Sequence, residues 1–102
     1  MGDNILRTNM YLSFKINDTP YESEILYDDS DFYVEKDGNK IPISLKIASD
    51  NKVAFDSFIN DIDDISDVIM SGIPNSTFNI VDDYINHLRA LQFNQALLHL
   101  LA

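Results

Sequence analysis

Residues 41–69, IPISLKIASDNKVAFDSFINDIDDISDVI, contain the change of pattern on which the predicted fold depends. From Ile41 to Ile47 apolar and polar residues alternate, which is typical of a half-buried strand. After Asp50 the apolar residues recur at intervals of three and four, which favours an amphipathic helix. The stretch therefore predicts a strand followed by a helix over about residues 50–71.

Three more alternating segments precede this stretch, and they are centred on residues 10–16, 21–27 and 32–35. The short segments between them are rich in Asn, Asp, Pro and Gly, the residues that favour tight turns. Strands joined by such short turns pair with their neighbours in the chain. We therefore expect a four-stranded antiparallel β-meander within residues 9–48.

The remainder of the chain predicts further helix. Gly72 followed by Pro74 is a stop signal for the first helix, and Ser76 is suited to cap the next. The apolar direction of this second helix shifts after Gln92, so the helix either breaks near residues 92–94 or continues and buries two sides. The expected fold is one α+β domain over residues 1–102, β-rich over 9–48 and helical over 50–101, with two or three helices packed on one face of the sheet.

Charge and composition exclude several classes of function. The chain has 102 residues, with 17 acidic and 7 basic ones, and a formal net charge of −10. Such a chain repels nucleic acid and anionic membranes. It has no cysteine, which excludes disulfides, thiolate metal sites and cysteine nucleophiles. We find no apolar run long enough to cross a bilayer and no signal-peptide core, so we expect a soluble, cytoplasmic protein.

An acidic stripe is the most informative predicted surface. Asp56, Asp63, Asp64 and Asp67 lie on or beside one side of the predicted helix, opposite its apolar face. Successive turns are about 5.4 Å apart, comparable with the spacing of phosphates along a nucleic-acid strand. Between Lys52 and Arg89 there are seven aspartates and no basic residue. The stripe is either a solvated face or a surface for a basic protein, such as a nucleic-acid-binding effector or nuclease.

A secondary acidic patch consists of Asp28, Asp29 and Asp31. Their spacing fails the EF-hand pattern, and His87 and His99 project about 120° apart on one helix, so we expect no metal site and no cofactor. Arg89 is expected to pair with Asp82 or Asp83. No nucleophile motif or glycine-rich phosphate loop is present, so we expect no catalytic residue.

The end of the chain is unusually apolar. Phe93, Leu97, Leu100 and Leu101 lie within the last ten residues. Chain ends are commonly polar unless they are packed against something. These residues therefore either join the chain's own core or form an interface with a partner or with a second copy in a homodimer.

In size and charge, the chain is similar to the small acidic proteins with which phages and plasmids block host defences, and to nuclease-toxin immunity proteins. That similarity implies a non-catalytic inhibitor whose carboxylates occupy a basic nucleic-acid channel as a decoy. The alternative is an oligomeric structural or assembly protein that acts through its apolar C-terminal helix. A small enzyme is the third hypothesis. Salt dependence separates the first two, because only decoy binding should weaken steeply with salt.

Overall fold

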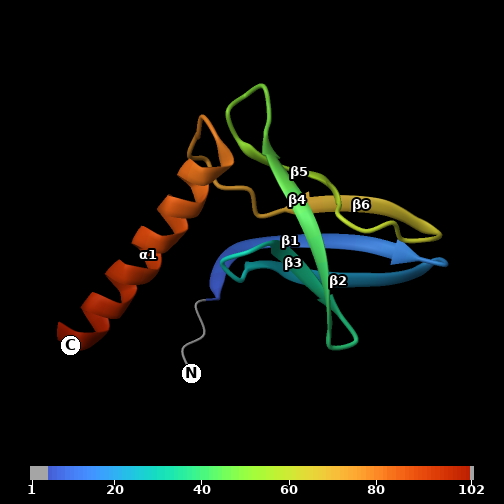
Figure 1. Cartoon of the computed structure of the whole chain (residues 1–102), viewed down its shortest axis with the longest axis horizontal. Coiled ribbons are helices and arrows are strands. Elements are labelled where there is room, and N and C mark those ends of the chain that lie inside the picture. Colours follow the sequence, from blue (N-terminus) through green and yellow to red (C-terminus); the bar gives the residue numbers. More distant parts are fainter. Residues whose placement is uncertain (1–4, 102) are drawn as a thin grey trace.

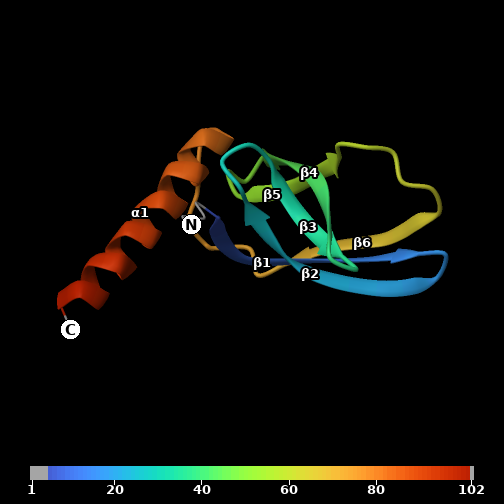
Figure 2. The same ribbon diagram turned by 60° about the horizontal axis from the view of Figure 1, so that its bottom comes forward.

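A computed structural model of the chain describes residues 5–101, without the side chains of His99 and Leu101. This part of the chain forms six strands and one helix: β1 (Leu6–Ile16), β2 (Thr19–Tyr27), β3 (Phe32–Lys36), β4 (Asn39–Ile47), β5 (Val53–Phe58), β6 (Ile65–Ser71) and α1 (Val81–Leu101). The strand order is β5-β4-β3-β2-β1-β6, and all neighbouring pairs are antiparallel. The sheet curls into a nearly closed barrel, and β5 and β6 are its two edges (Figures 1 and 2).

The core lies inside this curled sheet and under the first part of α1. On β1 the side chains of Met10, Leu12 and Phe14 alternate inward and are fully buried, as period-two patterning requires. Leu6 of β1 also belongs to the core. The other strands and the helix complete it with Ile25, Tyr27, Phe32, Val34, Ile43, Leu45, Val53, Tyr84, Ile85 and Leu88. A single apolar core is therefore shared by the sheet and one helix.

The predicted fold class is wrong in its second half. The first four strands lie where residue alternation predicts them, although β1 already begins at Leu6. Residues 50–71, however, form β5 and β6 in place of the predicted helix. The described chain thus has six strands and one helix, not a four-stranded meander with two or three helices.

Register shifts in the two edge strands explain this error. Ser44 pairs with Ser57 while Leu45 pairs with Phe55, so Asp56 is an extra residue on β5. A similar shift on β6 lies beside Asp67, whose φ is 52°. An extra residue of this kind places neighbouring core-facing side chains three positions apart instead of two. The core-contacting pairs Phe55 with Phe58 and Ile65 with Val68 show this spacing, which in the sequence resembles helical periodicity.

Gly72, the predicted stop signal of a helix, has a different role in the structure. It follows strand β6 and not a helix, with φ +76°. A Cβ atom at this position would lie 2.6 Å from the carbonyl oxygen of Asn9. The glycine therefore permits both a left-handed turn and a close approach of two backbones.

The segment between β6 and α1 is tied to the turn before β5. The Phe78 amide donates to the carbonyl oxygen of Asn51 at 2.7 Å, and the Asn51 side-chain amide donates to the carbonyl oxygen of Phe78 at 3.3 Å. Ser76 does not start the helix, because α1 begins at Val81, with Asp82 and Asp83 in its first turn. Aspartates there favour the positive end of the helix dipole. The helix then runs through residues 92–94 without a break.

Candidate functional site

The first part of α1 is part of the core. We call residues 81–88 the inner half, and it packs against β1 and β4. Tyr84, Ile85 and Leu88 are buried, and the Tyr84 ring lies 6.1 Å from that of Phe32 and 5.2 Å from that of Phe78. The inner half thus closes one end of the barrel.

The rest of the helix extends away from the barrel (Figures 1 and 2). We call residues 91–101 the outer half. Three side chains of the predicted interface are strongly exposed: Phe93 by 66%, Leu97 by 44% and Leu100 by 83%. Leu101, the fourth, ends the helix, and its side chain lies outside the described part. Leu91 and Leu98 are also exposed and belong to the same half.

The polar side of the outer half faces the barrel. Gln92 Nε2 donates to the carbonyl oxygen of Ile5 at 3.5 Å. Gln92 and Gln95 line a groove of about 260 Å³ between the helix and the start of β1, together with Ile5, Arg7, Asn9, Leu88 and Leu91. A helix turns about 100° per residue, so Phe93, Leu97 and Leu100 point roughly 120–180° away from Leu88. The side with these three residues is therefore turned away from the chain's own core.

The outer half also carries no formal side-chain charge. From Ala90 to the end of the sequence there is no Asp, Glu, Lys or Arg. The rest of the chain contains all 17 acidic and 7 basic residues. Exposed apolar residues without interspersed charges are typical of interaction surfaces and not of solvated helix faces.

The predicted acidic stripe does not lie on a helix. Asp56 is on β5, Asp67 is on β6, and Asp63 and Asp64 lie in the connecting loop, residues 59–64. The regular helical spacing that suggested a phosphate-like row is therefore not present. Nor is Asp67 without a basic neighbour, because its Oδ2 lies 3.2 Å from Lys15 Nζ.

Asp56 and Asp67 instead occupy comparable places on the two edges of the sheet. Each lies beside a register shift in an edge strand. Charged residues and bulges on edge strands oppose pairing with strands of other molecules. Protection of the sheet edges therefore explains these two carboxylates, and no basic binding protein is needed to explain them.

The secondary acidic patch organises the loop between β2 and β3. Asp28 Oδ1 accepts hydrogen bonds from the amides of Asp31 at 2.9 Å and Ser30 at 3.0 Å, and Asp28 Oδ2 accepts one from Lys40 Nζ at 3.2 Å. The pKa of Asp28 is lowered, mainly by the hydrogen bond from the Asp31 amide. The Ser30 amide and the Lys40 ammonium lower it further, and burial opposes them. Asp28 is thus a structural residue of the loop.

Asp29 in the same loop joins the barrel to α1. Its Oδ1 lies 2.9 Å from Arg89 Nη2, so Arg89 pairs with this loop and not with Asp82 or Asp83 as predicted. Asp29 has a positive φ of 75°. Arg89 is the last charged residue of the chain, and it marks the boundary between the two halves of the helix.

A buried hydroxyl lies at the centre of the inner half. Tyr84 is 1% exposed, and within residues 5–101 its hydroxyl is the one buried side-chain polar atom without a hydrogen bond of good geometry. Its neighbour Thr8 already donates to the carbonyl oxygen of Ile25 and accepts from the amide of Met10. Burial raises the pKa of Tyr84, and its interaction with Thr8 opposes this only in part. The hydroxyl is enclosed on all sides, so we assign it no chemistry.

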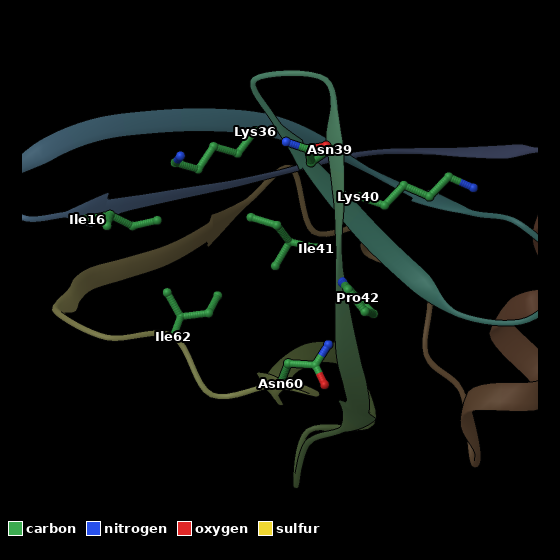
Figure 3. A pocket seen from close by; sticks show the side chains of 8 residues that line it. All are labelled: Ile16, Lys36, Asn39, Lys40, Ile41, Pro42, Asn60 and Ile62. Carbon is green, nitrogen blue, oxygen red and sulfur yellow. The ribbon is translucent and has the colours of Figure 1, made fainter.

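A shallow pocket of about 350 Å³ lies at the other end of the barrel (Figure 3). Ile16, Ile41 and Ile62 point toward a common space, whereas Lys40 extends away from it. The ammonium groups of Lys36 and Lys40 pair with Asp37 at 3.1 Å and Asp28 at 3.2 Å. The pocket is therefore an apolar hollow at the barrel end, without a free charged group that would orient a substrate.

The histidines and carboxylates do not assemble into a metal site in the described part of the chain, where no group of three or more such residues converges. The His87 ring packs 5.4 Å from the ring of Phe78, and the side chain of His99 lies outside the description. None of the described helical segments is long and apolar enough to cross a membrane.

Comparison with protein-family models, with curated proteins and with solved structures finds no match for this chain. Inference about function therefore rests on the chain's own surfaces. Among these surfaces, the outer half of α1 exposes large apolar side chains that do not pack against the barrel.

Proposed function

We propose that this chain is a non-catalytic binding protein that attaches to another protein through the outer half of α1. One observation carries the proposal: Phe93, Leu97 and Leu100 are exposed on the side of the helix turned away from the barrel. An internal packing role would require these side chains to face β1, where Gln92 and Gln95 lie instead. The proposal corresponds to the assembly alternative that the sequence raises.

The apolar area of the outer half favours a protein partner. Full burial of a Leu or Phe side chain contributes about 1.5–3 kcal/mol, so three such residues are a substantial driving force for association. A preformed helix with an apolar face also has less conformational entropy to lose when it binds than a disordered tail would have. Such helices bind by laying the apolar face in a groove or against a second helix.

A lipid surface fits the helix less well. Helices that lie on membranes commonly carry Lys or Arg on the polar face, where they meet anionic headgroups. The polar side of the outer half carries glutamines, and the chain has a net charge of −10. Anionic lipids would therefore repel the molecule.

The decoy hypothesis stays a prediction with a weaker geometric basis. A decoy of this kind needs a row of aspartates at one-turn intervals, but these residues lie on two strands and a loop. The net charge of −10 still favours a basic partner by long-range attraction. The helix proposal needs no such partner and uses a surface that is otherwise unexplained.

The experiment is a capture assay with an N-terminally tagged full chain in a lysate of the cells that make it. Leu97→Asp introduces a charge on the apolar side, and Gln95→Asp introduces the same charge on the polar side as the matched control. We expect the wild type and Gln95→Asp to retain the same bound protein, and Leu97→Asp to lose it. Equal capture by all three chains would contradict the proposal.

A further inference from the structure

The apolar positions of the outer side of α1 have a symmetrical spacing. Ala90, Phe93, Leu97 and Leu100 follow one another at intervals of three, four and three residues. This is the spacing of a two-helix seam, in which apolar side chains recur every 3.5 residues on average. Read from either end of the helix, the spacing is the same.

We propose that this seam binds a second copy of the same chain, in an antiparallel helix pair about a two-fold axis near residue 95. This inference rests on the proposed function and names the partner. Antiparallel pairing about residue 95 places Phe93 opposite the partner's Leu97 and Ala90 opposite the partner's Leu100. Each layer then joins a larger side chain to a smaller or comparable one, and a two-fold interface uses the same surface on both copies.

Charge identifies where two copies can meet. Each chain carries a net charge of −10, so most approaches between two copies bring like charges together. No residue from Ala90 onward has a charged side chain. Residues 90–101 project from the barrel (Figure 2). The segment is therefore the surface on which two acidic copies can touch without opposing carboxylates.

The same repulsion favours the antiparallel direction. In a parallel pair the two barrels lie side by side at the same end of the seam. In an antiparallel pair they lie at opposite ends of a segment of about twelve residues, roughly 18 Å long. The Debye length is about 8 Å at physiological ionic strength, so the separated barrels are largely screened from one another.

The length of the seam sets the expected affinity. Three helical turns provide less contact than the roughly 800 Å² per partner of a standard interface. We therefore expect a reversible dimer with a dissociation constant on the order of micromolar. Association should depend weakly on salt, because the seam is apolar.

Sedimentation of the full chain, from about 1 µM to about 500 µM, tests this inference. We expect a shift from monomer to dimer for the wild type and for Gln95→Asp, and a dissociation constant at least about 100-fold weaker for Leu97→Asp, which buries a charge in the seam twice. A monomer at every concentration, or a dimer that Leu97→Asp leaves unchanged, would overturn the self-association. If the wild type captured another protein in the lysate assay and Leu97→Asp did not, the proposed function would still hold without self-association.

The direction of pairing has its own test, because the chain contains no cysteine. Ala90→Cys and Leu100→Cys are prepared as separate chains, mixed, and treated with oxidised glutathione, which accepts the two electrons released when two thiols join. An antiparallel seam predicts the mixed disulfide between the two variants. Predominance of disulfides between two copies of the same variant would overturn the antiparallel arrangement.

Discussion

The inner and outer halves of α1 belong to one continuous helix, yet their apolar residues have opposite fates. In the inner half, Tyr84, Ile85 and Leu88 are buried against the barrel. In the outer half, Phe93, Leu97 and Leu100 are exposed on the other side, and glutamines face the barrel. Arg89, held by Asp29, lies at the boundary between them.

Apolar content alone therefore does not locate a core. The inner half has charged residues on its free side, as expected of a helix that solvates one face. The outer half has none, although it is the more exposed of the two. If the helix served only to pack against the core, its more exposed half would carry more of the charged residues. The inner half therefore serves stability, and we infer that the outer half serves association.

The largest effect separates the halves directly. Leu88→Ala leaves a cavity in the core and should lower the free energy of unfolding by about 3 kcal/mol. Leu97→Ala removes an exposed side chain and should change the stability of the monomer by less than about 0.5 kcal/mol. Urea unfolding of both variants at a concentration below dimer formation measures the contrast. Equal losses would mean that the outer half is also packed within the chain.

The next effect concerns the connection that leads to α1. Gly72→Ala requires a left-handed backbone at a residue with a Cβ, and that atom would lie 2.6 Å from the Asn9 carbonyl oxygen. We expect a loss of about 2 kcal/mol in unfolding free energy. Because Gly72 is remote in sequence from the seam, the dimer constant of the folded protein should stay unchanged. Denaturation together with sedimentation checks both expectations, and a stability equal to that of the wild type would contradict the first.

A smaller effect concerns the loop that holds Arg89. Asp28→Asn weakens the hydrogen bonds to the Asp31 and Ser30 amides and should cost about 1 kcal/mol at neutral pH. Since the pKa of Asp28 is lowered in the folded protein, its stabilisation is present above the ordinary value of 3.8 and is lost as the pH falls through the folded-state pKa. The difference in thermal stability between wild type and variant should therefore shrink below about pH 4. A constant difference across that range would contradict the role of the carboxylate.

The smallest effect lies at the centre of the inner half. Tyr84→Phe removes a buried hydroxyl that has no hydrogen bond of good geometry in the described chain. Its removal should leave the free energy of unfolding within about 1 kcal/mol of the wild type, or raise it. The packing of the ring against Phe32 and Phe78 is retained. A loss well beyond that range would show that the hydroxyl is satisfied, and calorimetry is sufficient to decide.

Residue patterns predict some of this molecule well. The alternation in β1 to β4 places four strands correctly, because core residues recur at every second position in each of them. Residues 53–71 mislead, because the register shifts beside Asp56 and Asp67 put core-facing residues three apart. Such shifts depend on pairing with β4 and β1, which a local pattern does not contain. Gly72 is a related case, because the sequence indicates that an element ends there but does not indicate its close approach to Asn9.

The surfaces divide in the same way. The change of apolar direction after Gln92 correctly indicates that Phe93, Leu97 and Leu100 diverge from the buried side of the helix. The acidic residues could not be placed, because their positions followed from a helix that the chain does not form. Arg89 pairs with Asp29, which is 60 positions away in the sequence. Helical spacing instead predicts pairing with Asp82 or Asp83. Long-range contacts of this kind need the assembled barrel.

Hydrogen–deuterium exchange of α1 across a dilution series compares its two halves most directly. We expect strong protection of the inner half at every concentration, because opening it exposes the core. Protection of the outer half should rise with concentration and should be absent at all concentrations in Leu97→Asp. Equal and concentration-independent protection of both halves would show that the outer half is covered by its own chain, and would contradict its assignment as an interaction surface.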